Sequence, residues 1–130
     1  MPSKPRVLLV DEHEDFRQEV QRLLEPEFEV IGVAPDGRAA LEMVELLSPD
    51  VAVLDVHAPV MGGIEAARRL CERCTGVRVV FLSSHQSPAL IGAALSTGAL
   101  GYVFKASALE DLGRAIWSVL EERSFVSSLK

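Results

Sequence analysis

Short apolar segments and longer stretches with helical spacing alternate along this chain of 130 residues, and the alternation restricts its fold more than any other feature. The segments with the length and composition of buried strands are residues 6–11, 28–33, 51–55, 77–82 and 101–104. Apolar residues recur at helical spacing after each of them, as Phe16, Val20, Leu23 and Leu24 do after the first. Strands that alternate with helices are typical of a parallel sheet covered on both faces. The sequence therefore predicts an α/β three-layer sandwich with a five-stranded parallel sheet.

Helix boundary signals support this division. Asp36 is a candidate N-cap for the second helix, and Ser87-Pro88 combines an N-cap with proline in the first helical position. Gly98 is expected to stop that fourth helix near Thr97. Residues 107–110 have the form of a capping box that opens the last helix. The chain length fits one domain, which we assign to residues 1–124, with 125–130 as a C-terminal tail or the start of a linker.

Composition excludes several classes of protein. The formal charge of -6 does not suit a domain that binds nucleic acid by itself, because phosphate backbones attract Lys and Arg. No apolar run reaches the roughly 18 residues that cross a bilayer, and residues 1–6 lack the layout of a signal peptide. Two cysteines do not form a secreted disulfide framework. These features predict a cytoplasmic protein without membrane contact.

Charged and hydroxyl side chains follow the predicted strands where each strand ends. They are Asp11 and Glu12 after the first, Asp55 at the end of the third, Ser83 and Ser84 after the fourth, and Lys105 after the fifth. Ligands of open α/β sheets bind outside the carboxyl ends of the strands, so we expect these groups to converge. Three neighbouring carboxylates repel one another unless a cation balances them, and Mg²⁺ prefers such oxygen ligands.

Asp55 is the candidate nucleophile of this predicted site, because it is central and alone on its strand. A carboxylate that attacks a phosphoryl group forms an acyl phosphate, which is a known form of covalent catalysis. The metal would neutralise the developing charge, while Lys105 and the Ser83 hydroxyl would hold the other phosphoryl oxygens.

Four segments resemble the receiver domains of two-component response regulators: Leu-Leu-Val-Asp11-Glu12, Asp55-Val-His-Ala-Pro59 followed by Gly63, Phe-Leu-Ser83-Ser84, and Gly-Tyr102-Val-Phe-Lys105. Together they are specific, and the resemblance extends from Arg6 to about Glu122. It implies a flavodoxin-like (βα)5 fold with strand order 2-1-3-4-5.

The resemblance also implies a role for each matching residue. Asp55 is implied as phosphoacceptor, Asp11, Glu12, Asp55 and the backbone carbonyl of His57 as ligands of Mg²⁺ or Mn²⁺, Lys105 as the phosphate-pairing lysine, Ser83 as the switch hydroxyl, and Tyr102 as the switch aromatic. A protein of this kind catalyses only its own phosphorylation and dephosphorylation, and is not an enzyme acting on other molecules.

The implied phosphodonor is a phosphohistidine on a sensor histidine kinase, and the implied output is a process such as transcription. Residues 11–17 look most like the NarL/FixJ-type subgroup, whose members usually carry a C-terminal helix-turn-helix domain, and we expect that domain to be missing from these 130 residues. Contact with DNA is therefore expected only through such a domain, and a homodimer is a further expectation.

Three residues depart from the pattern of the family. Glu12 stands where Asp is usual, Ala58 where Met is frequent, and Ala106 follows Lys105 where many members have a cis proline. Glu is one methylene longer than Asp, and Mg²⁺ tolerates little distortion of its octahedral shell. Glu12 and Ala58 motivate one alternative, a phosphorylation-independent interaction module with the shape of a receiver.

Two other functions on related folds fit the sequence less well. A flavodoxin-like flavin binder would need a phosphate loop after the first strand, but residues 11–15 are mostly acidic. A phosphohydrolase with an aspartate nucleophile commonly has a second Asp two residues later, where this chain has His57.

The histidines and cysteines suggest further sites. His13, His57 and His85 all fall on loops at the same edge, and we interpret them as exposed loop residues rather than as a transition-metal site. A milder hypothesis is that His57 and His85 flank the path of the attacking water and tune the lifetime of the phosphoryl group. Cys71 and Cys74 have CxxC spacing near a helix C-terminus, which does not favour a reactive thiolate, so we interpret them as structural.

Overall fold

The computed structural model describes residues 3–73 and 76–128 of the chain. In chain order the elements are β1 Arg6–Val10, α1 Glu14–Leu24, β2 Glu29–Ala34, α2 Gly37–Leu47, β3 Val51–Asp55, α3 Gly63–Glu72, β4 Arg78–Ser83, α4 Pro88–Leu95, β5 Gly101–Phe104, a 3₁₀ turn at Lys105–Ser107, α5 Ala108–Leu120 and β6 Phe125–Val126. Every predicted strand and helix is present, with boundaries that differ by a residue or two.

The strands form one parallel sheet in the order β2-β1-β3-β4-β5-β6. The first five follow the predicted order 2-1-3-4-5, so the flavodoxin-like α/β sandwich is confirmed. The described residues add a short sixth strand beside β5, which the sequence did not predict.

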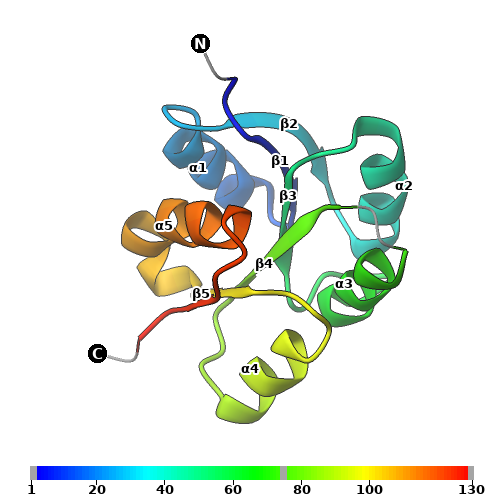
Figure 1. The fold of residues 1–130 in the computed structure, drawn as a ribbon, viewed down its shortest axis with the longest axis vertical. Coiled ribbons are helices and arrows are strands. Elements are labelled where there is room, and N and C mark those ends of the chain that lie inside the picture. The colour runs from blue at the N-terminus through cyan, green and yellow to red at the C-terminus, as the bar shows by residue number, and fades with distance from the viewer. Residues whose placement is uncertain (1–2, 74–75, 129–130) are drawn as a thin grey trace.

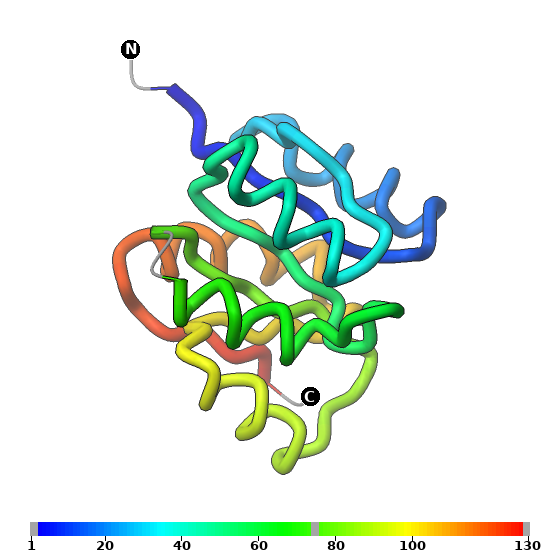
Figure 2. The backbone as a smooth tube through the Cα atoms, turned by 90° about the vertical axis from the view of Figure 1, so that its right-hand side faces the viewer, coloured from blue at the N-terminus to red at the C-terminus, as the bar shows by residue number. Residues whose placement is uncertain are grey.

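Two apolar cores lie on opposite faces of the sheet. Helices α1 and α5 cover one face, where Val20, Leu24, Leu112 and Ile116 pack against the strands (Figure 1). Helices α2, α3 and α4 cover the other face, and Figure 2 shows them side by side in front of the sheet. Buried on both faces, the central strands are almost continuously apolar.

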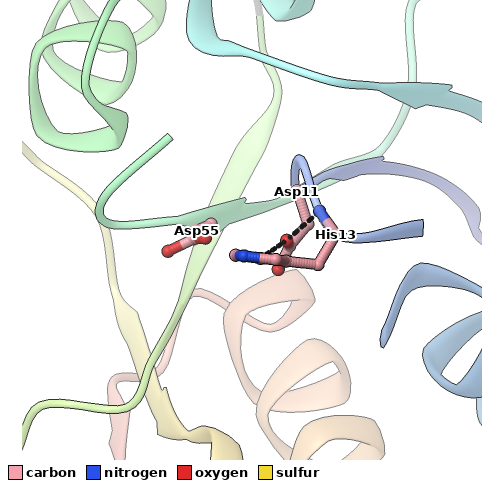
Figure 3. Close-up of side chains that lie close together, drawn as sticks. All are labelled: Asp11, His13 and Asp55. Atoms are coloured by element: carbon pink, nitrogen blue, oxygen red, sulfur yellow. Dashed lines mark hydrogen bonds and ion pairs between the residues drawn. The ribbon is translucent and has the colours of Figure 1, made fainter. Parts of the chain in front are cut away.

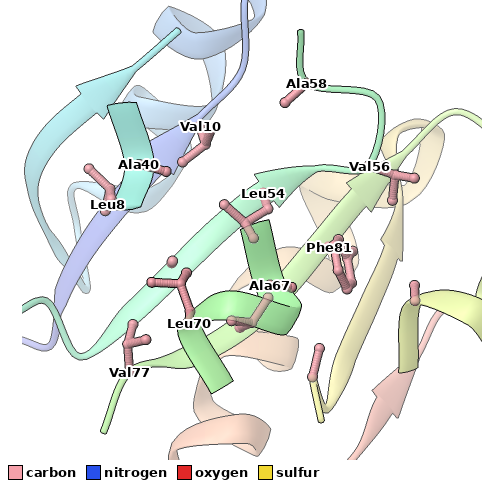
Figure 4. Packing of buried hydrophobic residues seen from close by; sticks show 14 of the residues in the cluster. Leu8, Val10, Ala40, Leu54, Val56, Ala58, Ala67, Leu70, Val77 and Phe81 are labelled. Atoms are coloured by element: carbon pink, nitrogen blue, oxygen red, sulfur yellow. The ribbon is translucent and has the colours of Figure 1, made fainter. Parts of the chain in front are cut away.

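The core beneath α2, α3 and α4, which is the larger of the two, packs against β3. Ala67 and Leu70 of α3 lie over Leu54 of β3, with Phe81 of β4 beside them (Figure 4). Leu54 and Phe81 are both fully buried, and their backbones pair directly across the two strands. Val51 and Val53 of β3 belong to the other core, so the strand that ends in Asp55 is packed on both faces.

Most of the predicted helix signals are confirmed. The Asp36 carboxylate accepts the Ala39 N–H at 2.8 Å, and the Ser87 hydroxyl accepts the Leu90 N–H at 3.4 Å. The predicted capping box is wrong, because within the described residues the Ser107 side chain makes no capping hydrogen bond. A 3₁₀ turn precedes α5 instead, and the ψ of Ser107 is 7° where an N-cap residue has extended backbone. Helix α4 ends at Leu95, two residues before the predicted end.

Strand β6 lies in the segment that was expected to be a tail or linker. Its Phe125 N–H bonds to the Leu100 carbonyl at 2.9 Å, and the Ser127 N–H bonds to the Tyr102 carbonyl at 2.9 Å. The Ser127 hydroxyl also accepts the Phe104 N–H at 3.1 Å and donates to an Asp111 carboxylate oxygen at 2.8 Å. The C-terminal segment is therefore bonded along the edge of β5.

Among the described residues, none of the helices combines the length and the apolar character that a membrane span requires.

Candidate functional site

The carboxyl ends of β1, β3 and β5 bring two acidic side chains and one basic side chain together. Asp11 and Asp55 are 4% and 5% exposed, so both carboxylates lie almost entirely beneath the surface. The Lys105 ammonium is 3.1 Å from Asp11 Oδ2 and 3.5 Å from Asp55 Oδ2, so it bridges the two. Burial of two like charges this close requires a cation beside them, and Lys105 supplies one.

The backbone fixes the orientation of each carboxylate. The His57 N–H donates to Asp55 Oδ1 at 3.0 Å, and the His13 N–H donates to Asp11 Oδ1 at 2.9 Å. These local bonds occupy one oxygen of each carboxylate and leave the Oδ2 atoms facing Lys105. The Lys105 ammonium also lies 4.6 Å from the centre of the Phe16 ring, which provides a cation–π contact.

The loop after β3 is seated tightly against the start of α3. The Gly63 N–H bonds to the Val56 carbonyl at 3.0 Å, and a Cβ atom on Gly63 would overlap the Asp55 carbonyl. Glycine is therefore required for this approach of helix to strand. Val60 in the same loop has a φ of 67°, and the Met61 N–H bonds to the Pro59 carbonyl at 2.7 Å across it.

Ser83 is the last residue of β4, and Tyr102 lies within the neighbouring strand β5. The Ser83 hydroxyl is fully buried and accepts the His85 N–H at 3.0 Å. The Tyr102 side chain is also fully buried, and its hydroxyl donates to the His85 carbonyl at 2.9 Å. Burial raises the pKa of Tyr102, and a hydrogen bond with Ser83 opposes that shift. The two predicted switch residues are thus joined through the backbone of His85.

Glu12 and His13 follow Asp11 on the loop between β1 and α1. The Glu12 side chain is 47% exposed, and its carboxylate is outside the group of ligand atoms found among the described residues. That group joins Asp11, His13 and Asp55, whose ligand atoms all lie within 4.8 Å of one another (Figure 3). The His13 side chain is 63% exposed on this loop, which agrees with the sequence interpretation.

The other histidines form a separate pair. The rings of His57 and His85 lie edge to face with their centres 4.5 Å apart. They lie on the two loops that follow Asp55 and Ser83, as the sequence suggested.

The structure also shows the surroundings of the other two departures from the family pattern, Ala58 and Ala106. Ala58 is 5% exposed and belongs to the larger core, so its small side chain is packed rather than open to solvent. All peptide bonds among the described residues are trans, including the one that joins Lys105 to Ala106.

Cys71 is half-buried near the end of α3, and burial raises the pKa of its thiol, which agrees with a structural residue. Cys74 lies outside the described residues.

The donor set suits a hard divalent cation. Asp11 and Asp55 bring two buried carboxylates close together, and carboxylate oxygens are the ligands that Mg²⁺ and Mn²⁺ favour. The arrangement can therefore present one carboxylate as a nucleophile while the rest of the site holds positive charge around it.

Comparison with known proteins gives a consistent assignment. The sequence model of the response regulator receiver domain matches residues 7–117. The transcriptional regulatory protein DegU of Brevibacillus brevis is 36% identical over 126 residues, which are 95% of this chain and 53% of that protein. The probable transcriptional regulatory protein NarL of Mycobacterium tuberculosis (strain ATCC 25618 / H37Rv) is 36% identical over 128 residues, which are 97% of this chain and 59% of that protein.

Solved structures agree with the sequence relatives. The signal receiver domain of the putative response regulator NarL from Mycobacterium tuberculosis superposes with a TM-score of 0.89 at 36% identity, covering 94% of this chain and 100% of that one. A two-component response regulator of the LuxR family from Aurantimonas sp. SI85-9A1 gives 0.89 at 34% identity, covering 95% and 89%. The chain spans somewhat more than half the length of the curated relatives that it matches. On this family match and these relatives, the chain belongs to the response regulator receiver domain family.

Proposed function

We propose that this receiver domain accepts a phosphoryl group on Asp55 from the phosphohistidine of a sensor histidine kinase and passes a conformational signal to an output such as transcription. The observation that carries the proposal is the Asp55 carboxylate itself. It is 5% exposed at the end of β3, and its Oδ2 atom lies 3.5 Å from an ammonium shared with Asp11.

The transfer step follows from the roles of these residues. Asp55 Oδ2 would attack phosphorus, because Oδ1 is held by the His57 N–H. The P–O bond to aspartate would form as the P–N bond to the donor imidazole breaks, and the nitrogen would keep the bonding electrons and take up a proton. Lys105 would then pair with a phosphoryl oxygen and offset its negative charge. A Mg²⁺ or Mn²⁺ ion bound by Asp11, Asp55 and the His57 carbonyl, with Glu12 at its edge, would supply further positive charge to the phosphoryl oxygens.

The switch would involve Ser83 and Tyr102. The Ser83 hydroxyl accepts a bond from the His85 N–H, and on phosphorylation it would donate its own proton to a phosphoryl oxygen. Movement of Ser83 toward that oxygen would alter the loop whose His85 carbonyl accepts from Tyr102. A change at Asp55 would thereby reach the face formed by α4 and β5.

The same proposal covers the catalytic scope, the location and the partners of the protein. The protein would catalyse only its own phosphorylation and dephosphorylation, would act in the cytoplasm with its kinase, and would contact DNA only through a separate C-terminal domain. A homodimer would be checked by sedimentation of the protein with and without a phosphodonor.

The direct test is the intact mass of the protein after incubation with acetyl phosphate, with and without Mg²⁺. We expect a gain of one phosphoryl group that depends on the metal and is absent in Asp55→Asn. Asp15→Asn is the matched control, since Asp15 is exposed in the first turn of α1 and should leave the gain unchanged. No gain with any divalent ion would contradict the proposal and favour a phosphorylation-independent interaction module, and Glu12→Asp would then be the next variant.

A further inference from the structure

The ammonium of Lys105 lies against the ring of Phe16 as well as beside two carboxylates. We infer that Phe16 is a positioning residue for Lys105: its ring holds the ammonium beside Asp55 Oδ2 before a phosphoryl group arrives, and does not compete with that group for the charge. This inference rests on the proposed function, because it assigns a residue that prepares the same site for phosphoryl transfer.

The long reach of the Lys105 side chain creates the need for such a residue. Lys105 follows β5, whereas Asp55 ends β3 and Asp11 follows β1, and β4 lies between β5 and β3 in the sheet. The side chain therefore extends across the edge of the sheet to reach both carboxylates. Lysine has a flexible four-carbon stem, so holding it in one conformation costs entropy. A contact that restricts the ammonium beforehand removes this cost from the transfer step.

The ammonium has partners of two kinds in the part of the chain that the structure describes. Nζ is 3.1 Å from Asp11 Oδ2 and 3.5 Å from Asp55 Oδ2, and it lies over the Phe16 ring, 4.6 Å from the ring centre. A third carboxylate in place of the ring would form an ion pair that an incoming phosphoryl oxygen has to displace. The face of an aromatic ring attracts a cation through its quadrupole instead. Phe16 therefore stays in contact while Lys105 exchanges a carboxylate for a phosphoryl oxygen.

Burial strengthens the contact. The Lys105 side chain is 20% exposed, and a cation–π interaction is stronger when water is largely excluded from the cation.

The ring is fixed in turn by the packing of α1. Phe16 lies in the first turn of this helix and packs, partly buried, against the core that contains Val20 and Leu24. Val20 and Leu24 are four and eight residues further along, so all three share one face of the helix. Since Val20 and Leu24 are buried, the helix that carries the ring is anchored to the sheet. Helix α1 thereby supplies a rigid support for a side chain that begins at the end of β5.

Lysine NMR tests the contact without any phosphodonor. The chain has three lysines, Lys4, Lys105 and Lys130, so protein labelled with isotopic lysine gives three ε-methylene signals. We expect an upfield ring-current shift of the Lys105 signal, which is assigned by its loss in Lys105→Arg. The shift should disappear in Phe16→Leu and remain in Phe16→Tyr. The Lys4 signal is the internal reference, because Lys4 bonds to the Glu25 carbonyl at the other end of α1.

The rate constant of phosphorylation by acetyl phosphate in Mg²⁺ tests the consequence. We expect Phe16→Leu to lower it by about fivefold and Phe16→Tyr to keep it within about twofold of the wild-type value. Leu23→Ala is the matched control and should leave the rate constant unchanged. Leu23 is also a partly buried residue of α1 that packs against the same core, but it lies about two turns beyond Phe16.

Fluorinated phenylalanines in place of Phe16 separate the charge of the ring from its shape. Ring fluorination withdraws electron density from the face of the ring and changes its packing little, so it weakens the attraction for a cation. We expect the rate constant to fall stepwise as fluorines are added, by about threefold for a trifluorinated ring. A purely structural role of Phe16 predicts equal rate constants across this series. Equal rate constants, or a Lys105 signal without a ring-current shift, would overturn the inference.

Failure of the inference can be told apart from failure of the proposed function. Phosphorylation of the wild-type protein and of Phe16→Leu at the same rate would refute only the positioning role. Absence of phosphorylation, with the ring-current shift of Lys105 still present, would refute the phosphoacceptor role but confirm that Phe16 holds the ammonium.

Discussion

Val60 adopts a backbone conformation that β-branched residues rarely tolerate. Its φ of 67° lies in the left-handed region, its side chain is 78% exposed, and the bond from Met61 to Pro59 closes a tight turn around it. Because little packing opposes the change, Val60→Gly should raise the free energy of unfolding by about 1 kcal/mol. Urea denaturation would measure this change in the free energy of unfolding. Val60→Ala keeps the Cβ atom and serves as control, and equal stability of the two variants would contradict the strain.

Tyr102 should titrate above its ordinary pKa of about 10, because burial penalises the tyrosinate. The chain contains one tyrosine, so the ultraviolet absorbance of tyrosinate reports on this residue alone. A pKa raised in the folded state means that the stabilising effect of the neutral hydroxyl is complete below pH 10. That effect is lost as pH rises through the folded-state pKa. A titration at or below the ordinary value would show that the hydroxyl is not buried in solution.

Side-chain direction at the site illustrates what residue types alone do not determine. Asp11, Asp55, Ser83 and Lys105 were predicted at the site because strand ends in a parallel sheet share an edge. Their convergence required only the strand order. Whether Glu12 turns inward depends on the backbone dihedrals of the β1–α1 loop, and the sequence pattern carries no signal for them.

At the scale of elements, Ser127 joins β6 to the rest of the domain. Ser127 is 5% exposed, and its hydroxyl bonds to both Phe104 and Asp111. Ser127→Ala would leave the Phe104 N–H and an Asp111 oxygen without this partner, at a cost of about 1–3 kcal/mol in unfolding free energy. Chemical denaturation would detect the loss. The exposed neighbour supplies the control, since Ser128→Ala should change stability by less than about 0.5 kcal/mol.

The elements themselves were largely predictable, and the exceptions have physical reasons. The apolar pattern of the sequence predicts long amphipathic helices and fully buried strands well, and β3 and β5 have the predicted bounds. Strand β6 is two residues long, too short for any periodic pattern, and it exists because the edge of β5 offers free backbone groups. The prediction of a capping box was wrong because Ser107 belongs to the 3₁₀ turn that precedes α5.

For the whole molecule, we expect divalent cations to raise thermal stability, because they bind the folded site and not the unfolded chain. At an ion concentration of a hundred times Kd the gain is about 2.7 kcal/mol, which corresponds to a shift of several degrees in Tm. Differential scanning calorimetry with Mg²⁺ and with Mn²⁺ would measure it. Sodium chloride at equal ionic strength is the control, and an equal shift in sodium chloride would mean that screening, not binding, stabilises the fold.

The bond between Ser127 and Phe104 has a consequence for signalling. Phe104 immediately precedes Lys105, so one end of β5 contacts the acidic site while its outer edge holds the C-terminal segment. Any coupling between these two places must be reciprocal, since linkage is a property of free energies and not of direction. If Asp55 is phosphorylated as proposed, a partner that binds residues 125–128 would shift the equilibrium of that phosphorylation by the same factor by which phosphorylation shifts the affinity for the partner.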